Sequence, residues 1–227
     1  MTENEMWATR AVACELLALS LRYPDETLAG AAASGEWLGA AREVAGALEL
    51  GLPEGFGVGL PREEDAAAGS VSDEQVAAML HELRPEATRL FVGAPDPACS
   101  PYEGVWRAQA DGVQPLLFVN PHSMEVERFC RSCGLGRPEG TNEPLDHAAT
   151  ELELLCHLAS RAAGTVDPSA CIVSEADLPG GSAAAAYDQF VTEHLNAWAP
   201  QFAEKLAAEA RHPFYCAVAA LLAAFLA

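Results

Sequence analysis

The apolar residues of this chain recur at helical spacing, and few segments alternate with the period of two that a half-buried strand shows. Alanine and leucine dominate the composition. The pattern predicts an all-α protein, a single globular bundle of roughly eight to ten helices. The predicted helices cover residues 4–22, 25–33, 36–50, 72–91, 120–133, 145–163, 183–197, 200–210 and a last segment that begins at Pro213.

Capping patterns locate several helix ends. Ser72 and Gln75 form an S-x-x-Q capping box, and Gly134 stands where a helix often ends in a left-handed residue. Pro85 is expected to kink or split its helix, because proline lacks the N–H of a continuous helix. Pro213 fits a first turn, where the missing N–H is harmless.

Residues 51–71 are rich in glycine and proline and also carry charge. This composition predicts a long, mobile loop. The chain has 227 residues and shows no internal repeat, and the loop is not expected to separate two independent domains. We therefore expect one helical domain over residues 1–227.

The charge of the chain limits its partners. Its 13 basic and 33 acidic side chains leave a net charge of −20. Such a surface repels nucleic acid and anionic lipid, so neither is an expected partner. It attracts a cationic partner, and salt should weaken that attraction.

The ends of the sequence and its cysteines indicate a reducing compartment. The N-terminal residues lack the pattern of a secretory signal, and the apolar stretch 214–227 is short for a membrane span. We expect a buried terminal helix, no stable membrane insertion and a cytoplasmic location. The seven cysteines are scattered and are expected to be reduced thiols.

An Asp-His pair, Asp146 and His147, precedes the helix predicted at 145–163. Glu143 lies before it, and Glu151 is one turn after His147, on the same helix face. Asp146 can cap the helix. An Asp-His pair is also the core of metal-dependent phosphohydrolases on helical scaffolds, which need further ligands. These residues leave two interpretations open: a hydrolase, or a capped helix with a surface His-Glu pair.

A CxxC motif, Cys130 to Cys133, lies at the end of a predicted helix. A redox CxxC usually starts a helix, where the dipole lowers the thiol pKa, and a zinc site needs a second ligand pair. Two packing cysteines are therefore favoured. No phosphate-binding loop and no Ser-His-Asp arrangement is recognisable.

Four aromatic residues lie next to turns or proline-rich loops: Phe91, Tyr102, Trp106 and Trp198. Aromatic side chains in such places can line a groove for an extended or helical peptide. Each of them, taken alone, more often seals a core.

Three ordered motifs resemble one known family. They are "RLFVGAPDPACSPYEGVW" at 89–106, "EPLDHAATELELL" at 143–155 and "FVTEHLNAWAPQF" at 190–202. Their order and spacing are similar to those of the TorD/DmsD family of redox-enzyme maturation proteins, which includes NarJ-like chaperones. The resemblance covers most of residues 72–227. Two features depart from the family pattern: Gly104 replaces a serine, and the N-terminal half has a longer linker.

The resemblance implies an all-helical cytoplasmic chaperone rather than an enzyme. Such a protein binds the twin-arginine signal peptide of a molybdopterin oxidoreductase, or its apo catalytic subunit, until the cofactor has been inserted. The chaperone itself is expected to hold no cofactor and no metal, and to be a monomer or a domain-swapped homodimer. Guanine nucleotides, which some members bind, are not expected without a phosphate loop.

The expected peptide site is formed by aromatic, apolar and acidic side chains that belong to these motifs. Aromatic and apolar side chains would take the apolar part of the leader, and carboxylates would pair with its guanidinium groups. The predicted peptide-binding residues are Phe91, Pro101, Tyr102, Glu103, Trp106, Glu143, Pro144, Asp146, His147, Glu151, His194 and Trp198.

Overall fold

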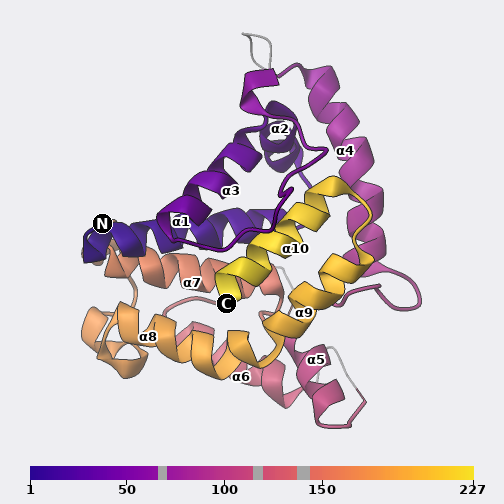
Figure 1. The fold of residues 1–227 in the computed structure, drawn as a ribbon. Helices are drawn as coiled ribbons and strands as arrows, with labels where there is room; N and C mark the ends of the chain where they lie inside the picture. The colour runs from indigo at the N-terminus through magenta and orange to yellow at the C-terminus, as the bar shows by residue number, and fades with distance from the viewer. Residues whose placement is uncertain (66–70, 115–119, 137–143) are drawn as a thin grey trace. The chain divides into compact units, whose positions relative to one another are not determined.

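The computed structural model describes residues 1–65, 71–114, 120–136 and 144–227. Within these ranges the structure is helical and has no strand, and one isolated backbone bridge occurs. The predicted all-α fold is confirmed. The α-helices are α1 (Glu3–Leu21), α2 (Glu26–Ser34), α3 (Glu36–Ala47), α4 (Asp73–Ala87), α5 (Glu103–Ala110), α6 (Pro121–Ser132), α7 (Ala148–Ala162), α8 (Ala183–Phe190), α9 (Asn196–Glu209) and α10 (Pro213–Leu226) (Figure 1).

The chain divides into two compact units. Unit 1 consists of Met1–Ala18 and Pro101–Ala199, and unit 2 of Leu19–Ser100 and Pro200–Ala227. The division falls within α1 and within α9. That residues 1–227 act as one domain stays a prediction.

Several helix ends follow the predicted capping chemistry. The Ser72 hydroxyl accepts from the Gln75 backbone N–H and the Gln75 side chain accepts from Ser72, so the capping box is present. Asn120 caps α6, with its side chain accepting from the His122 N–H at 3.0 Å. Pro213 occupies the first turn of α10, as predicted.

The alternative that Pro85 splits its helix is wrong, whereas the predicted kink stays a prediction. α4 continues through Pro85 to Ala87, and a π-helical turn over Thr88–Val92 follows until Gly93. Pro200 likewise lies inside α9, which follows a second π-helical turn at Val191–Leu195. Wider turns of this kind change the hydrogen-bond register locally. Because α4 and α9 continue through Pro85 and Pro200, neither proline ends its helix.

One helix was not predicted. α5, Glu103–Ala110, lies directly after the proline-rich loop that contains Pro95 and Pro97. Its N-cap residue, Tyr102, makes no side-chain cap hydrogen bond. The helix therefore lacks the usual sequence signal at its start, and its cap comes from elsewhere in the chain.

The aromatic core of unit 2 surrounds α10. Phe214 packs on Trp37 of α3, with ring centroids 4.8 Å apart, and Tyr215 meets Phe91 edge to face at 5.6 Å. The buried Trp37 indole donates to the Ser20 hydroxyl at 2.8 Å. The predicted burial of the terminal helix is confirmed. Among the described residues, no helix is both long and apolar enough to cross a membrane.

Unit 1 is built on contacts between α7 and α8 and between α5 and α6. Phe129 of α6 meets Phe190 of α8 edge to face, with ring centroids 5.1 Å apart. His194, one turn after Phe190, stacks on that ring at 4.8 Å. The histidine is thereby held in the interior, where only 5% of its surface is exposed.

Residues 51–65 of the predicted loop form turns and a short 3₁₀ segment, Glu63–Asp65. Gly57 has a positive φ of 77°, and Leu38 leaves no room for a Cβ at that position. Residues 66–70 of this loop lie outside the described residues. The mobility of the loop stays a prediction.

Candidate functional site

Two of the sequence motifs meet in unit 1 at a short antiparallel bridge between Tyr102 and His147. The Glu103 N–H donates to the Asp146 carbonyl at 2.9 Å, and the Ala148 N–H donates to the Pro101 carbonyl at 2.7 Å. The Tyr102 and His147 rings meet edge to face, with centroids 5.1 Å apart. The bridge therefore joins the start of α5 to the start of α7.

The Asp146 carboxylate caps α5 rather than the helix that follows it in sequence. Its Oδ2 accepts from the Gly104 N–H at 2.9 Å and from the Ser123 hydroxyl at 2.6 Å, and only 1% of the residue is exposed. The prediction that Asp146 caps its own helix is wrong, because His147 is the N-cap residue of α7. His147 Nδ1 accepts from the Ala149 N–H at 3.1 Å.

Gly104 occupies a crowded position beside this carboxylate. A Cβ there would lie 2.4 Å from the Ser123 hydroxyl oxygen and 2.9 Å from both Asp146 Oδ2 and Asn120 Nδ2. Asn120 Nδ2 also donates to the Gly104 carbonyl at 2.6 Å. The glycine that departs from the family pattern is therefore the residue that fits this local arrangement.

A second group of buried polar side chains lies next to the bridge. Glu103 is fully buried, and its Oε1 accepts from Arg107 at 2.6 Å and pairs with His194 Nδ1 at 3.2 Å. Glu151 is also fully buried, and its Oε2 accepts from the Trp198 indole at 3.1 Å. The expected surface pair between His147 and Glu151 is wrong, because Glu151 faces the interior.

The electrostatics of this group favour a neutral Glu151. Burial, the Glu103 charge and a side-chain hydrogen bond with Glu103 raise the pKa of Glu151 well above its usual range. With both carboxyls ionised, Glu103 Oε2 and Glu151 Oε1 would each lack a partner. A proton on Glu151 allows a side-chain hydrogen bond between Glu151 and Glu103, because two ionised carboxylates have no donor between them. Burial also raises the pKa of Asp146.

The other predicted site residues differ in exposure. Pro101 and Pro144 are buried, whereas Tyr102, Trp106 and His147 are each partly exposed. The structure thus separates the predicted set in unit 1 into an interior group and a smaller group at the surface. Their role in peptide binding stays a prediction.

Two predicted residues fall outside this arrangement. Phe91 belongs to unit 2, where it packs on Phe202 and Tyr215. Glu143 lies outside the described residues.

Sequence reasoning missed three residues that organise the site. Asn120 links α6 to α5, Ser123 donates to Asp146, and Arg107 contacts Glu103. In the sequence, the Asn-Pro pair at 120–121 indicates only the start of a helix. Arg107 follows Glu103 by four residues, an ion-pair spacing that becomes recognisable only once α5 is known.

The CxxC cysteines lie at the end of α6, as predicted, and both are buried. Burial raises the pKa of Cys130 to about 12 and that of Cys133 to about 11. Thiols with such values are poor nucleophiles at neutral pH. Within the described ranges, no group of three or more His, Cys, Asp or Glu side chains is arranged to hold a metal ion.

Comparison with known proteins agrees with this architecture. The profile of the family described as "Nitrate reductase delta subunit" matches residues 52–204, more than half of the chain. The chain belongs to this family, the TorD/NarJ-like group that its motifs resemble.

Individual relatives carry a more specific name. Two proteins called "Chaperone protein TorD", from Vibrio cholerae serotype O1 strains O395 and M66-2, are each 29% identical to this chain over 160 residues. The match covers 70% of this chain and 65% of each relative. The chain thus aligns with less than two thirds of the length of these relatives.

Proposed function

We propose that this protein is a maturation chaperone for a molybdopterin oxidoreductase, and that it binds the twin-arginine leader or the apo catalytic subunit of that enzyme. The family match supports this role, as do the relatives named as TorD chaperones. The observation that carries it is the bridge between Tyr102 and His147, which assembles two family motifs into one site.

The partly exposed residues Tyr102, Trp106 and His147 are the direct contacts in this proposal. Aromatic rings of this kind suit the apolar part of a leader peptide. The buried Asp146 carboxylate, together with the backbone hydrogen bond from the Glu103 N–H to the Asp146 carbonyl, holds the backbone segments that present these rings. The other predicted residues of unit 1, all of them buried, support the shape of the site: Pro101, Pro144, Glu151, His194 and Trp198.

Charge supplies the second part of the recognition. A twin-arginine leader is basic at its start, and this chain has a net charge of −20. Opposite charges steer the encounter and favour guanidinium–carboxylate pairs at the surface. The acidic surface therefore attracts the basic start of the leader, while the aromatic rings bind its apolar segment.

The chaperone would act in the cytoplasm, hold back the catalytic subunit until its cofactor is inserted, and catalyse no reaction itself. The alternative of a metal-dependent hydrolase has no specific observation in its favour. Asp146 Oδ2 accepts two hydrogen bonds and His147 Nδ1 accepts one, so these atoms already serve as helix caps.

Calorimetric titration with synthetic twin-arginine leaders from the molybdoenzymes of the same genome tests the proposal. We expect one leader to bind with micromolar or tighter affinity, and its Ala-Ala version to lose that binding. The variants Tyr102→Ala and His147→Ala should each weaken binding about tenfold, the effect of losing one well-packed contact. His81→Ala, a change at an exposed histidine of unit 2, is the matched control.

The outcomes separate the two levels of the proposal. If no leader binds but the apo catalytic subunit does, the chaperone role stands and leader recognition is rejected. If neither binds, the proposed function is wrong. If His81→Ala weakens leader binding as much as His147→Ala, the assignment of the site is wrong.

A further inference from the structure

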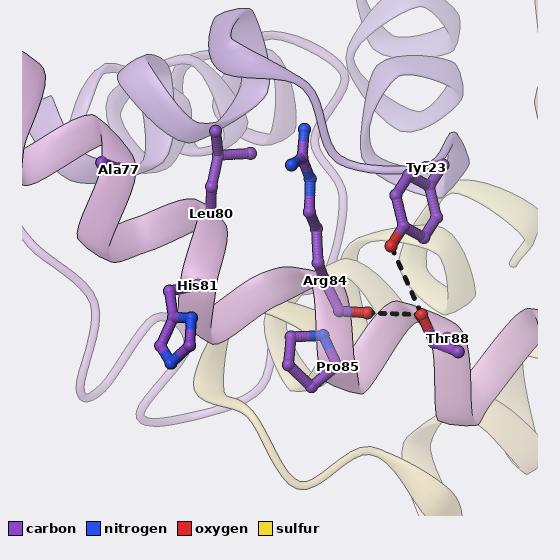
Figure 2. Close-up of a pocket in the computed structure, with 7 residues that line it drawn as sticks. All are labelled: Tyr23, Ala77, Leu80, His81, Arg84, Pro85 and Thr88. Atoms are coloured by element: carbon purple, nitrogen blue, oxygen red, sulfur yellow. Dashed lines mark hydrogen bonds between the residues drawn. The ribbon is translucent and has the colours of Figure 1, made fainter.

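A groove of about 470 Å³ opens on the surface of unit 2. Its lining comes from one face of α4, from the start of the following π-helical turn, and from the link between α1 and α2. Figure 2 shows Leu80 and Arg84 projecting from α4, with Tyr23 reaching in from that link toward Thr88. The lining residues are Tyr23, Ala77, Leu80, His81, Arg84, Pro85 and Thr88.

The Arg84 side chain is held in place within this groove. Its Nε donates to the Pro24 carbonyl at 3.1 Å, and its guanidinium carbon lies 5.9 Å from the centroid of the Tyr23 ring. Thr88 donates its hydroxyl proton to the Arg84 carbonyl at 2.8 Å, so Tyr23 is the donor in its 3.4 Å contact with Thr88. These contacts fix the aromatic ring and the cation relative to each other.

The outer end of Arg84 has no acidic partner. Within the described part of the chain, neither Nη1 nor Nη2 of this residue makes a hydrogen bond or an ion pair. A guanidinium group with both terminal nitrogens available binds a carboxylate in a two-pronged geometry. The chain therefore presents a preorganised receptor for one carboxylate.

Two acidic residues of α4, Glu82 and Glu86, are paired with groups that do not line the groove. Glu86 accepts from Arg89 and from the backbone N–H of Arg211, while Glu82 pairs with His212 at 3.4 Å. No acidic residue lines the groove, although the chain has 33 acidic and only 13 basic side chains. The lining of the groove thus carries the positive charge of Arg84, opposite in sign to the net charge of the protein.

The groove is elongated. Ala77, His81, Arg84 and Thr88 recur at spacings of four, three and four residues, which places them along one helix face. From Ala77 to Thr88 a helix rises roughly 16 Å. A small anion would occupy only the Arg84 end, whereas a peptide segment would also cover Leu80 and Pro85.

We propose that this groove docks an acidic segment of a partner protein. A carboxylate of that segment pairs with Arg84, and a neighbouring apolar side chain packs on Leu80, Pro85 and the Tyr23 ring. The inference goes beyond the proposed function, because a twin-arginine leader is basic and carries the wrong charge for this groove. It defines a second docking surface, in unit 2, with the opposite charge preference.

Fluorescence anisotropy with a labelled ten-residue peptide of alternating glutamate and leucine tests the proposal on the full-length protein. The same peptide with glutamine in place of glutamate should bind at least about tenfold more weakly, because it lacks the charge-assisted pair. Arg84→Gln should weaken binding of the glutamate peptide to the same extent. Arg84→Lys keeps the positive charge but lacks the two-pronged guanidinium group, so its affinity for the glutamate peptide should fall between those of the wild type and Arg84→Gln.

Arg128→Gln is the matched control, since it removes the same charge from an exposed position on α6. If Arg84→Gln and Arg128→Gln weakened binding equally, net charge alone would explain the binding and the proposal would be overturned. Failure of the glutamate peptide to bind the wild-type protein would also overturn it. If free N-acetylglutamate displaced the labelled peptide at the same concentration as unlabelled peptide does, the groove would bind a small anion and the proposal would be overturned. None of these readouts depends on leader binding.

Discussion

The carboxylate of Asp146 lies 2.9 Å from the backbone nitrogen of Gly104 and caps a helix that begins 43 residues earlier in the chain, at Glu103. The next residue, His147, caps the helix that follows. The Asp-His pair thus serves two helices at once. A substitution at either position should therefore affect the segment that carries Tyr102 as well as α7.

Replacing Asp146 by alanine should destabilise the protein by about 2–4 kcal/mol. The change leaves the buried Gly104 N–H without an acceptor, which costs about 1–3 kcal/mol. It also removes the acceptor of the partly buried Ser123 hydroxyl, which adds about 1 kcal/mol because water can replace part of that bond. Asp146→Asn keeps an acceptor oxygen and should cost about 1 kcal/mol or less. Urea-induced unfolding, followed by far-UV circular dichroism, measures both changes.

Asp188→Ala, a change at an exposed position of unit 1, is the control and should leave stability within about 0.5 kcal/mol. If Asp146→Asn were as damaging as Asp146→Ala, the capping role would be incorrect and the negative charge itself would be required.

The stability of the protein should respond to pH through Glu151. Its pKa is raised in the folded state, chiefly by burial and then by the Glu103 charge. The folded protein therefore holds this proton more tightly than the unfolded chain. The resulting stability is fully present below the unfolded pKa, near 4.5, and is lost as pH rises toward and through the folded value.

Glu151→Gln mimics the protonated side chain and should remove this contribution. Between pH 5 and 9, the free energy of unfolding of the wild type should fall relative to that of the variant. Glu193→Gln, on the exposed side of the same unit, should follow the wild type. Parallel profiles for wild type and Glu151→Gln would show that Glu151 is already ionised in the folded state.

The CxxC pair should be chemically inert in the folded protein. Burial raises the pKa of Cys130 to about 12 and that of Cys133 to about 11. Cys216 is exposed and should react first with iodoacetamide at neutral pH. Mass spectrometry of tryptic peptides after timed alkylation measures this order. Rapid labelling of Cys130 in the native protein, before denaturant is added, would point to a reactive thiol instead.

Glu86 should stabilise unit 2 at neutral pH. Hydrogen bonds from Arg89 lower the pKa of Glu86, and the Arg211 and His212 backbone N–H groups add to the effect. A lowered pKa contributes stability above the unfolded value, near 4.5, which is lost as pH falls through the folded value. Glu86→Gln should lower the free energy of unfolding by about 1–2 kcal/mol at pH 7.

The difference between wild type and Glu86→Gln should shrink toward pH 3. Glu82→Gln, on the same helix but largely exposed, should change stability by less than about 0.5 kcal/mol. Urea unfolding at pH 3, 5 and 7 provides the comparison. A difference that stays constant over this range would mean that packing, not the charge of Glu86, is responsible.

Leader binding should weaken as salt rises. The expected attraction between a basic leader and a chain of net charge −20 is screened over about 10 Å at 0.1 M salt. Calorimetric titrations from 20 to 300 mM sodium chloride should show a steady loss of affinity. A flat response would indicate that the acidic surface does not contribute to recognition.

Much of the helical pattern was predictable because it depends on neighbours in sequence. The capping box of Ser72 and Gln75 and the Pro213 start of α10 are local features, and both are present. Pro85 and Pro200 show the limit of such reasoning. Their effect depends on whether nearby turns can widen, which propensity alone does not reveal.

The candidate site was predictable in its parts but not in its arrangement. The sequence indicated that Tyr102, Glu103, Asp146 and His147 belong to one site. It placed Glu151 on the surface, because a glutamate on a helix is usually solvated. Only the packing of unit 1 brings Glu151 into the interior, where Trp198 donates to it.

The sequence by itself determined the helical class, most helix boundaries and the family, since periodicity, caps and motifs depend on residues close together in the chain. The tertiary structure decided which helix Asp146 caps and which carboxyl groups are buried. It also decided that Arg84 lies in a groove free of acidic side chains. Such properties depend on contacts between residues far apart in sequence, because hydrogen-bond partners and solvent exposure arise only when distant segments pack together.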